Sequence, residues 1–121
     1  MSKISEAELE VMKVVWNKKS ATSLDIIEEV SKQTDWSKNT IKTLISRLVD
    51  KEALKVIKDK GNLYIYKPII SEQVYKKSEN QNFLNKLYNG SVNDMLLSFV
   101  KSKKLTKKDL EELMQMIEDE D

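Results

Sequence analysis

The chain has 121 residues, the size of one compact domain or of a small domain with an appendage. It contains no histidine and no cysteine, which excludes the usual neutral-pH general base, thiolate nucleophiles, disulfides and nearly all zinc, iron or copper ligands. Gly61 and Gly90 are the two glycines, and their separation excludes a glycine-rich phosphate loop. The sequence therefore predicts a protein that is not an enzyme and that uses no metal or other cofactor.

The charge is nearly balanced over the whole chain but unevenly distributed along it. The formal net charge is +1, yet residues 36–67 contain eight basic and three acidic residues. Residues 109–121 contain seven acidic residues and no basic one. These two regions have opposite electrostatic characters, which favours different partners for each. No apolar stretch approaches the roughly 20 residues of a membrane span, so we expect a cytoplasmic protein without membrane insertion.

Five serine or threonine residues mark the expected starts of helices. Ser5, Ser37, Ser71 and Thr106 each follow an apolar residue and precede another by four positions, the pattern of an N-cap with a hydrophobic staple. Thr22 is a further candidate N-cap, with an acidic residue three positions on. The pattern predicts helices over residues 6–17, from 22 to near 34, from 38 to about 52, and three more after residue 71.

A β-hairpin is expected after the third helix. Residues 54–58 and 63–67 are rich in β-branched and aromatic residues, and the polar residues between them contain Gly61. Pro68 should close the unit, because proline cannot donate to a continuing ladder. The fold class is therefore mainly α, a winged helix-turn-helix DNA-binding domain over residues 1–70 followed by a helical dimerisation domain over residues 71–121.

The third helix has one apolar and one polar side. At 100° per residue, Ile41, Leu44, Ile45 and Leu48 form one buried stripe, and the remaining positions form a basic, hydrogen-bonding face suited to a major groove. The predicted contacts to double-stranded DNA are Ser37, Lys38, Asn39, Thr40, Lys42, Thr43, Ser46 and Arg47 on the helix, with Lys58 and Lys60 on the hairpin. The alternative is a winged-helix module that contacts proteins and not DNA.

Residues 71–121 form one-sided apolar helices that bury too little surface to be stable alone. A second copy of the chain is the simplest partner, which predicts a homodimer. The alternative is that these helices fold back on the first domain. The expected dimerisation residues are Leu84, Leu87, Tyr88, Met95, Leu96, Phe99, Leu110, Leu113 and Ile117.

The sequence resembles the BlaI/MecI family of penicillinase repressors over nearly its full length. The residues that carry the resemblance are 7–12, 15–16, 26–29, 35–48 and 83–90. The resemblance implies a homodimeric repressor that binds palindromic operators of β-lactamase or penicillin-binding-protein genes. It also implies a partner, a membrane sensor metalloprotease that cleaves the repressor when antibiotic is present.

Cleavage in this family occurs before a phenylalanine in the dimerisation region, and the similar bond here is Ser98–Phe99. A cut at this bond would remove the last 23 residues. The family's cleaved pair is Asn–Phe, so Ser98 departs from the pattern, and the alternative is that Phe99 is simply a core residue of the dimer. A related copper-responsive branch senses metal through C-terminal cysteines, which this chain lacks.

Overall fold

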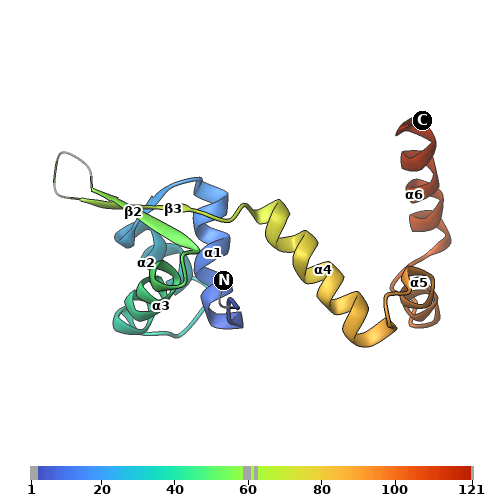
Figure 1. Ribbon diagram of the computed structural model, residues 1–121, viewed down its shortest axis with the longest axis horizontal. Coiled ribbons are helices and arrows are strands. Elements are labelled where there is room, and N and C mark those ends of the chain that lie inside the picture. The colour runs from blue at the N-terminus through green and yellow to red at the C-terminus, as the bar shows by residue number, and fades with distance from the viewer. Residues whose placement is uncertain (1–2, 59–60, 62, 121) are drawn as a thin grey trace. The chain divides into compact units, whose positions relative to one another are not determined.

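The computed structural model describes residues 3–58, 61 and 63–120 (Figure 1). The chain divides into an N-terminal unit, Met1–Tyr75, and a C-terminal unit, Lys76–Asp121. The functional division after residue 70 remains a prediction. The elements in chain order are α1 (Glu6–Lys18), β1 (Ala21–Thr22), α2 (Ser23–Ser31), α3 (Lys38–Asp50), β2 (Leu54–Lys58), β3 (Tyr64–Pro68), α4 (Glu72–Tyr88), α5 (Val92–Lys101) and α6 (Lys107–Glu120).

The five predicted N-caps are confirmed. In each, the side-chain oxygen accepts a hydrogen bond from the backbone N–H three residues on, at 3.1 to 3.2 Å. At Ser5, Thr22 and Thr106 a carboxylate also accepts the N–H of the cap residue, which completes a capping box. Ser91 caps α5 in the same way and was not predicted. These caps fix the helix starts because the first N–H groups of a helix have no partner inside it.

The three strands form one antiparallel sheet in the order β1-β3-β2. Ile57 lies opposite Ile65 in the hairpin, and Ala21 of β1 lies opposite Tyr66. Pro68 is the last residue of β3, opposite Leu54, in keeping with its missing N–H. Strand β1 was not predicted, because two residues carry no alternating pattern.

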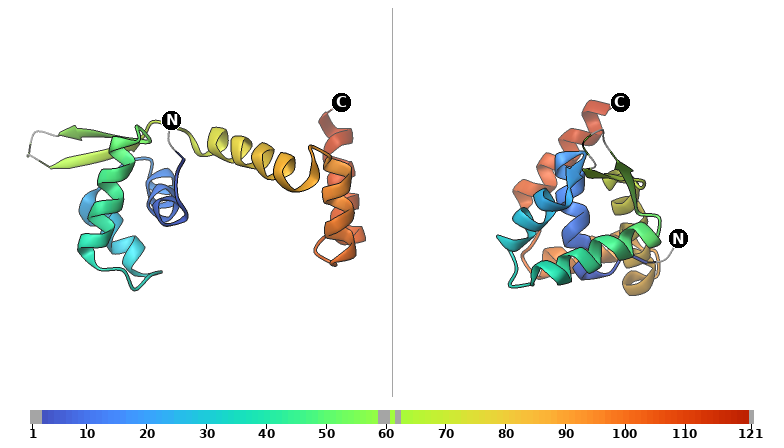
Figure 2. Two further views of the ribbon diagram at one scale, coloured as in Figure 1. Left: turned by 60° about the horizontal axis from the view of Figure 1, so that its bottom comes forward. Right: turned by 90° about the vertical axis from the view of Figure 1, so that its left-hand side faces the viewer.

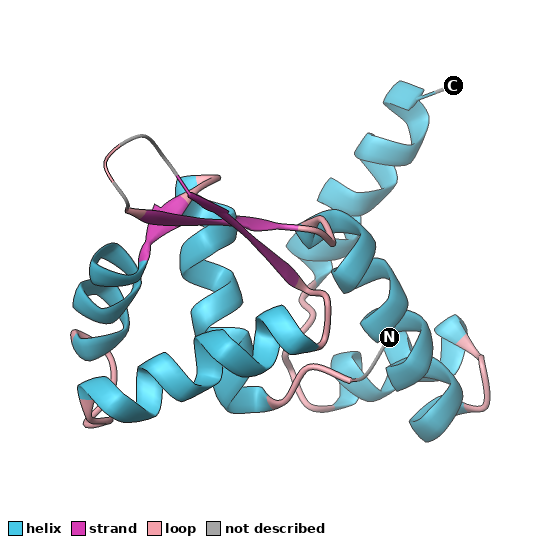
Figure 3. Ribbon diagram, turned by 60° about the vertical axis from the view of Figure 1, so that its left-hand side comes forward, coloured by secondary structure: helices cyan, strands magenta, loops and turns pink. Residues whose placement is uncertain are grey.

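Among the residues that the structure describes, the core lies entirely in the N-terminal unit and is made of thirteen buried hydrophobic residues between positions 4 and 54. The four predicted core positions of α3 are among them, whereas Leu9 and Trp16 of α1 are only partly buried. Helices α1, α2 and α3 lie on one side of the sheet (Figures 2 and 3). Three helices followed by a β-hairpin, closed on a common core, confirm the predicted winged helix.

The C-terminal unit has a different character. Among residues 76–119, no side chain is buried in the single chain. Large apolar side chains are exposed along it, and the most exposed include Leu87, Val92, Met114, Met116 and Ile117. None of the described helices is both long enough and apolar enough to span a bilayer.

Candidate nucleic-acid interface

Helix α3 presents a continuous polar face to solvent. Its apolar stripe is buried, with Ile41 and Leu48 fully inaccessible. The exposed residues around the remaining surface are the acidic Asp50 at its C-terminal end and, with the N-cap, the predicted contacts Ser37, Lys38, Asn39, Thr40, Lys42, Thr43, Ser46 and Arg47. The structure thus brings together the eight α3 positions predicted to contact DNA.

The N-terminus of α3 favours anions. The first turn contains no acidic residue and begins with Lys38. The aligned peptide dipoles place partial positive charge at this end of a helix, where unpaired N–H groups point outward. A phosphate of a nucleic-acid backbone suits this environment, and Lys38 adds a full positive charge beside it.

The hydroxyl groups of this face are largely occupied within the helix. Ser37 and Thr40 share a hydrogen bond between their hydroxyl oxygens at 2.9 Å. The Thr43 hydroxyl donates to the backbone carbonyl of Asn39 at 3.0 Å. These internal bonds cannot be predicted from the sequence, because it does not show whether a hydroxyl group bonds its own helix or stays free to reach a base edge. The side chains of Asn39, Lys42 and Arg47 form no such bond to their own helix among the described residues.

The β2–β3 hairpin adds further positive charge. Lys58 is exposed and lies opposite Tyr64, and Lys55 lies directly opposite Lys67. Like charges placed opposite each other repel, so a polyanion beside this pair would relieve that repulsion. Lys60, the second predicted contact of the hairpin, falls outside the described residues.

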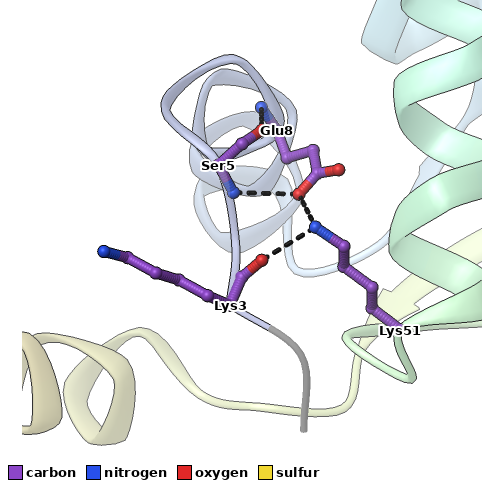
Figure 4. A network of polar contacts seen from close by, with 4 residues as sticks. All are labelled: Lys3, Ser5, Glu8 and Lys51. Carbon is purple, nitrogen blue, oxygen red and sulfur yellow. Dashed lines mark hydrogen bonds and ion pairs between the residues drawn. The ribbon is translucent and has the colours of Figure 1, made fainter.

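One basic residue of residues 36–67 does not contribute to the positively charged surface of α3 and the hairpin. Lys51, the C-cap of α3, pairs with the carboxylate of Glu8 and donates a second hydrogen bond to the Lys3 carbonyl at 2.7 Å (Figure 4). The Glu8 carboxylate also accepts the N–H of Ser5 at 2.9 Å. This network ties the C-terminal end of α3 to the start of α1. Sequence reasoning missed it because 43 residues separate the two charges.

The charge state of Glu8 follows from these partners. Burial alone would raise the pKa of the Glu8 carboxyl, which is 2% exposed. The hydrogen bonds from Lys51 and from the Ser5 backbone, with the positive charge of Lys51, outweigh that effect and hold the pKa below its ordinary value of 4.5. Glu8 is therefore ionised at neutral pH and acts as a fixed anchor for Lys51.

The two tryptophans are packing residues of the N-terminal unit. Trp36, just before the α3 N-cap, and Trp16 are partly buried against the core. The Trp16 indole N–H donates to the Ile70 carbonyl at 2.9 Å, and its ring lies 5.4 Å from that of Tyr75. Both rings therefore contribute to the packing of the N-terminal unit.

The predicted cleavage bond lies inside a helix. Ser98 and Phe99 both belong to α5, with Ser98 exposed and Phe99 partly buried. The Tyr88 hydroxyl donates to the Ser98 hydroxyl at 3.3 Å. The backbone around this bond is consequently helical and not extended.

The predicted dimerisation residues all remain accessible in the single chain. Three of them, Leu87, Leu113 and Ile117, are exposed, at 57%, 43% and 65% respectively. The partly buried ones are Leu84, Tyr88, Met95, Leu96, Phe99 and Leu110. They are distributed over α4, α5 and α6, so each of these helices carries apolar surface that the described chain leaves open.

Comparison with known proteins identifies the family. The model of the penicillinase repressor family matches residues 4–119. The chain belongs to the penicillinase repressor family. It is 41% identical to the penicillinase repressor of Bacillus licheniformis over 116 residues, which cover 96% of this chain and 90% of that protein. It is 40% identical to the methicillin resistance regulatory protein MecI of Staphylococcus aureus over 114 residues, which cover 94% and 92% of the two chains.

A solved structure supplies the counterpart of the N-terminal unit. The solution structure of monomeric B. licheniformis BlaI in complex with the blaP half-operator matches with a TM-score of 0.55 and 44% identity. The match covers 61% of this chain and 89% of that one. Membership of the penicillinase repressor family agrees with the resemblance seen in the sequence, and it confirms that the chain is a repressor-family protein and not an enzyme.

Proposed function

We propose that this penicillinase repressor-family chain is a homodimeric transcriptional repressor of β-lactam resistance genes. It binds palindromic operator DNA with one α3 helix of each copy in the major groove. The observation that carries the proposal is the face of α3, where the polar positions are exposed and the apolar stripe of Ile41, Leu44, Ile45 and Leu48 is buried. A relative that is 44% identical was solved in complex with a half-operator, which supports the same use of this unit.

The individual contacts follow from the chemistry of the face. Lys38, Lys42 and Arg47 neutralise phosphates or bind guanine, and Asn39 is the side chain suited to adenine. Ser37, Thr40, Thr43 and Ser46 complete the surface that faces the groove. Lys58 and Lys60 of the hairpin contact the backbone beside it. These contacts operate in the cytoplasm, where the operator DNA is accessible.

The C-terminal part of the chain, residues 71–121, holds two copies together. Its support is the apolar surface of α4, α5 and α6. In the single chain, no side chain of residues 76–119 is fully buried. Exposed apolar area of this kind marks an interaction surface in a soluble protein. Joining two half-site binders makes the second contact effectively intramolecular, worth on the order of 10² to 10⁴ in affinity.

Release from the operator proceeds by cleavage of the Ser98–Phe99 bond by a membrane sensor metalloprotease. Loss of the last 23 residues removes α6 and with it part of the apolar surface. Because the bond lies inside α5, the helix must open locally before an extended segment can enter a protease. The alternative, that Phe99 serves only to pack the dimer, predicts a repressor that the protease does not cut.

A salt titration tests DNA binding directly. Duplexes that bind are first selected from a random pool, and the affinity of the selected inverted repeat is then measured over a range of salt concentrations. We expect log affinity to fall linearly with log salt, with a slope of about −0.9 for each phosphate contacted. If no duplex binds at low salt, the chain is a protein-contact module and the proposal is wrong.

A further inference from the structure

Thr43 lies in the middle of the exposed face of α3, one turn from both Asn39 and Arg47. Its side chain carries one hydroxyl and one methyl group on the same tetrahedral carbon. The hydroxyl has a single proton, and that proton is used in the bond to the Asn39 carbonyl at 3.0 Å. The carbonyl oxygen can only accept, so the direction of this hydrogen bond is fixed.

This bond turns the hydroxyl of Thr43 back along its own helix. In a helix a threonine hydroxyl commonly bonds the carbonyl four residues earlier, which leaves the γ-methyl as the other heavy group on the β-carbon. With its proton used in this bond, the Thr43 hydroxyl can donate no hydrogen bond to a ligand, and the γ-methyl is the apolar group that Thr43 offers over α3. The neighbouring exposed positions of α3 carry the charged and amide side chains of Lys42, Asn39 and Arg47.

One base presents a matching group in the major groove. Thymine carries a methyl on C5, and contact between this methyl and a threonine methyl is a direct means of reading a base pair. We propose that Thr43 recognises a thymine in each operator half-site through its γ-methyl and not through its hydroxyl. This inference rests on the proposed function, since it requires that α3 enter the major groove.

Thr40 provides an internal contrast. Its hydroxyl is also occupied, but in a bond shared with the hydroxyl of the N-cap Ser37 at 2.9 Å. It lies in the first turn of the helix, where phosphates are the expected neighbours. We therefore expect the Thr40 methyl to lie beside the backbone at the edge of the groove and not against a base, and Thr40 serves as the matched control for the sensitivity of Thr43 to the thymine methyl.

The test removes the methyl group from each partner in turn. Each thymine of the selected operator is replaced singly by deoxyuridine, which lacks only the C5 methyl, and affinity is measured in the full-length protein. At one thymine in each half-site we expect a loss of about fourfold, the effect of withdrawing about one CH₂-sized group from an apolar contact. Replacing both symmetric thymines should cost about fifteenfold.

Two variants of Thr43 show whether its γ-methyl or its hydroxyl contacts the base. Thr43→Val keeps a methyl and loses the hydroxyl, so it should retain the sensitivity to deoxyuridine. Thr43→Ser keeps the hydroxyl and loses the methyl, so it should bind about fourfold more weakly per half-site and no longer distinguish deoxyuridine from thymidine. Thr40→Ser should leave the response to deoxyuridine unchanged. Thermal unfolding checks that each variant is folded.

Each other outcome overturns the inference in a recognisable way. If Thr43→Val loses affinity while Thr43→Ser keeps it, the hydroxyl accepts a hydrogen bond from a base and the methyl is not read. If operator binding is intact but no thymine responds to deoxyuridine, Thr43 makes no thymine contact. If no duplex binds at all, the proposed function fails, and this inference fails with it.

Discussion

The two units of this chain differ in how they use apolar residues. The N-terminal unit closes thirteen of them into a core, with Met12, Ile26 and Leu48 fully inaccessible. Residues 76–119 bury no side chain, although α5 and α6 have clearly amphipathic sequences. A winged helix is thus complete within one chain, whereas helices with uncovered apolar faces gain stability only from a partner surface. Four experiments test this difference between the two units.

Truncation should produce the largest effect. A chain ending at Ser98 lacks α6 and should be mainly monomeric in analytical sedimentation. Its affinity for a two-half-site operator should fall on the order of 10² to 10⁴, because the tether between half-site binders is lost. The unfolding transition of the N-terminal unit should persist. A stable dimer formed by this fragment would refute both the role of α6 and the proposed route of induction.

Replacing one leucine of each unit by alanine should distinguish packing within one chain from packing between two chains. Leu48→Ala leaves a cavity in the closed core and should destabilise the protein by about 2 to 5 kcal/mol at any protein concentration. Leu113 is 43% exposed in the single chain, so Leu113→Ala should act through association and depend on concentration. Urea unfolding at two protein concentrations measures both. A concentration-independent loss at Leu113 would mean that α6 packs within its own chain.

Acidification should affect the two units unequally through their capping boxes. The pKa of Glu8 is depressed, so its ion pair stabilises the fold above the ordinary value of 4.5 and is lost as pH falls through the lower folded-state value. At neutral pH, Glu8→Gln should lose about 1 to 3 kcal/mol of unfolding free energy. The difference from the unmodified protein should shrink below about pH 4.5.

Asp109 of the C-terminal unit is the control for Glu8. The backbone and side-chain hydrogen bonds of Thr106 lower the pKa of the Asp109 carboxyl, but among the described residues no lysine pairs with it. Asp109→Asn should therefore change the pH dependence of unfolding less than Glu8→Gln does. Equal changes in the two variants would show that the cap, and not the pair with Lys51, sets the acid response.

The smallest effect is expected from single surface lysines. Lys58→Ala in the hairpin should weaken binding to specific and random DNA alike and reduce the salt slope by about 1. Lys107→Ala removes a lysine that is also exposed but lies on α6, and it should leave the slope unchanged. The measurement is again affinity against salt. An effect of Lys107 equal to that of Lys58 would place α6 on the DNA as well.

The sequence was most informative where short-range rules apply. Caps such as Ser37 and the buried stripe of α3 depend on residues within one or two turns, so the helix starts and the exposed polar face of α3 could be predicted. The Glu8–Lys51 pair could not, because it joins α1 to the end of α3 and Lys51 resembles any other basic residue of residues 36–67. The hydrogen bond donated by the Thr43 hydroxyl could not be predicted either, because its acceptor is a backbone carbonyl.

Both tryptophans of the chain, Trp16 and Trp36, belong to the N-terminal unit, and both are partly buried against its core. Intrinsic fluorescence excited selectively in indole therefore reports on this unit alone. Trp36 precedes the α3 N-cap, so we expect its emission to change when DNA approaches α3, whereas the C-terminal unit contains no tryptophan and gives no direct indole signal. Tryptophan fluorescence thus reports on the N-terminal unit, and sedimentation reports on association of the chain, without an attached dye.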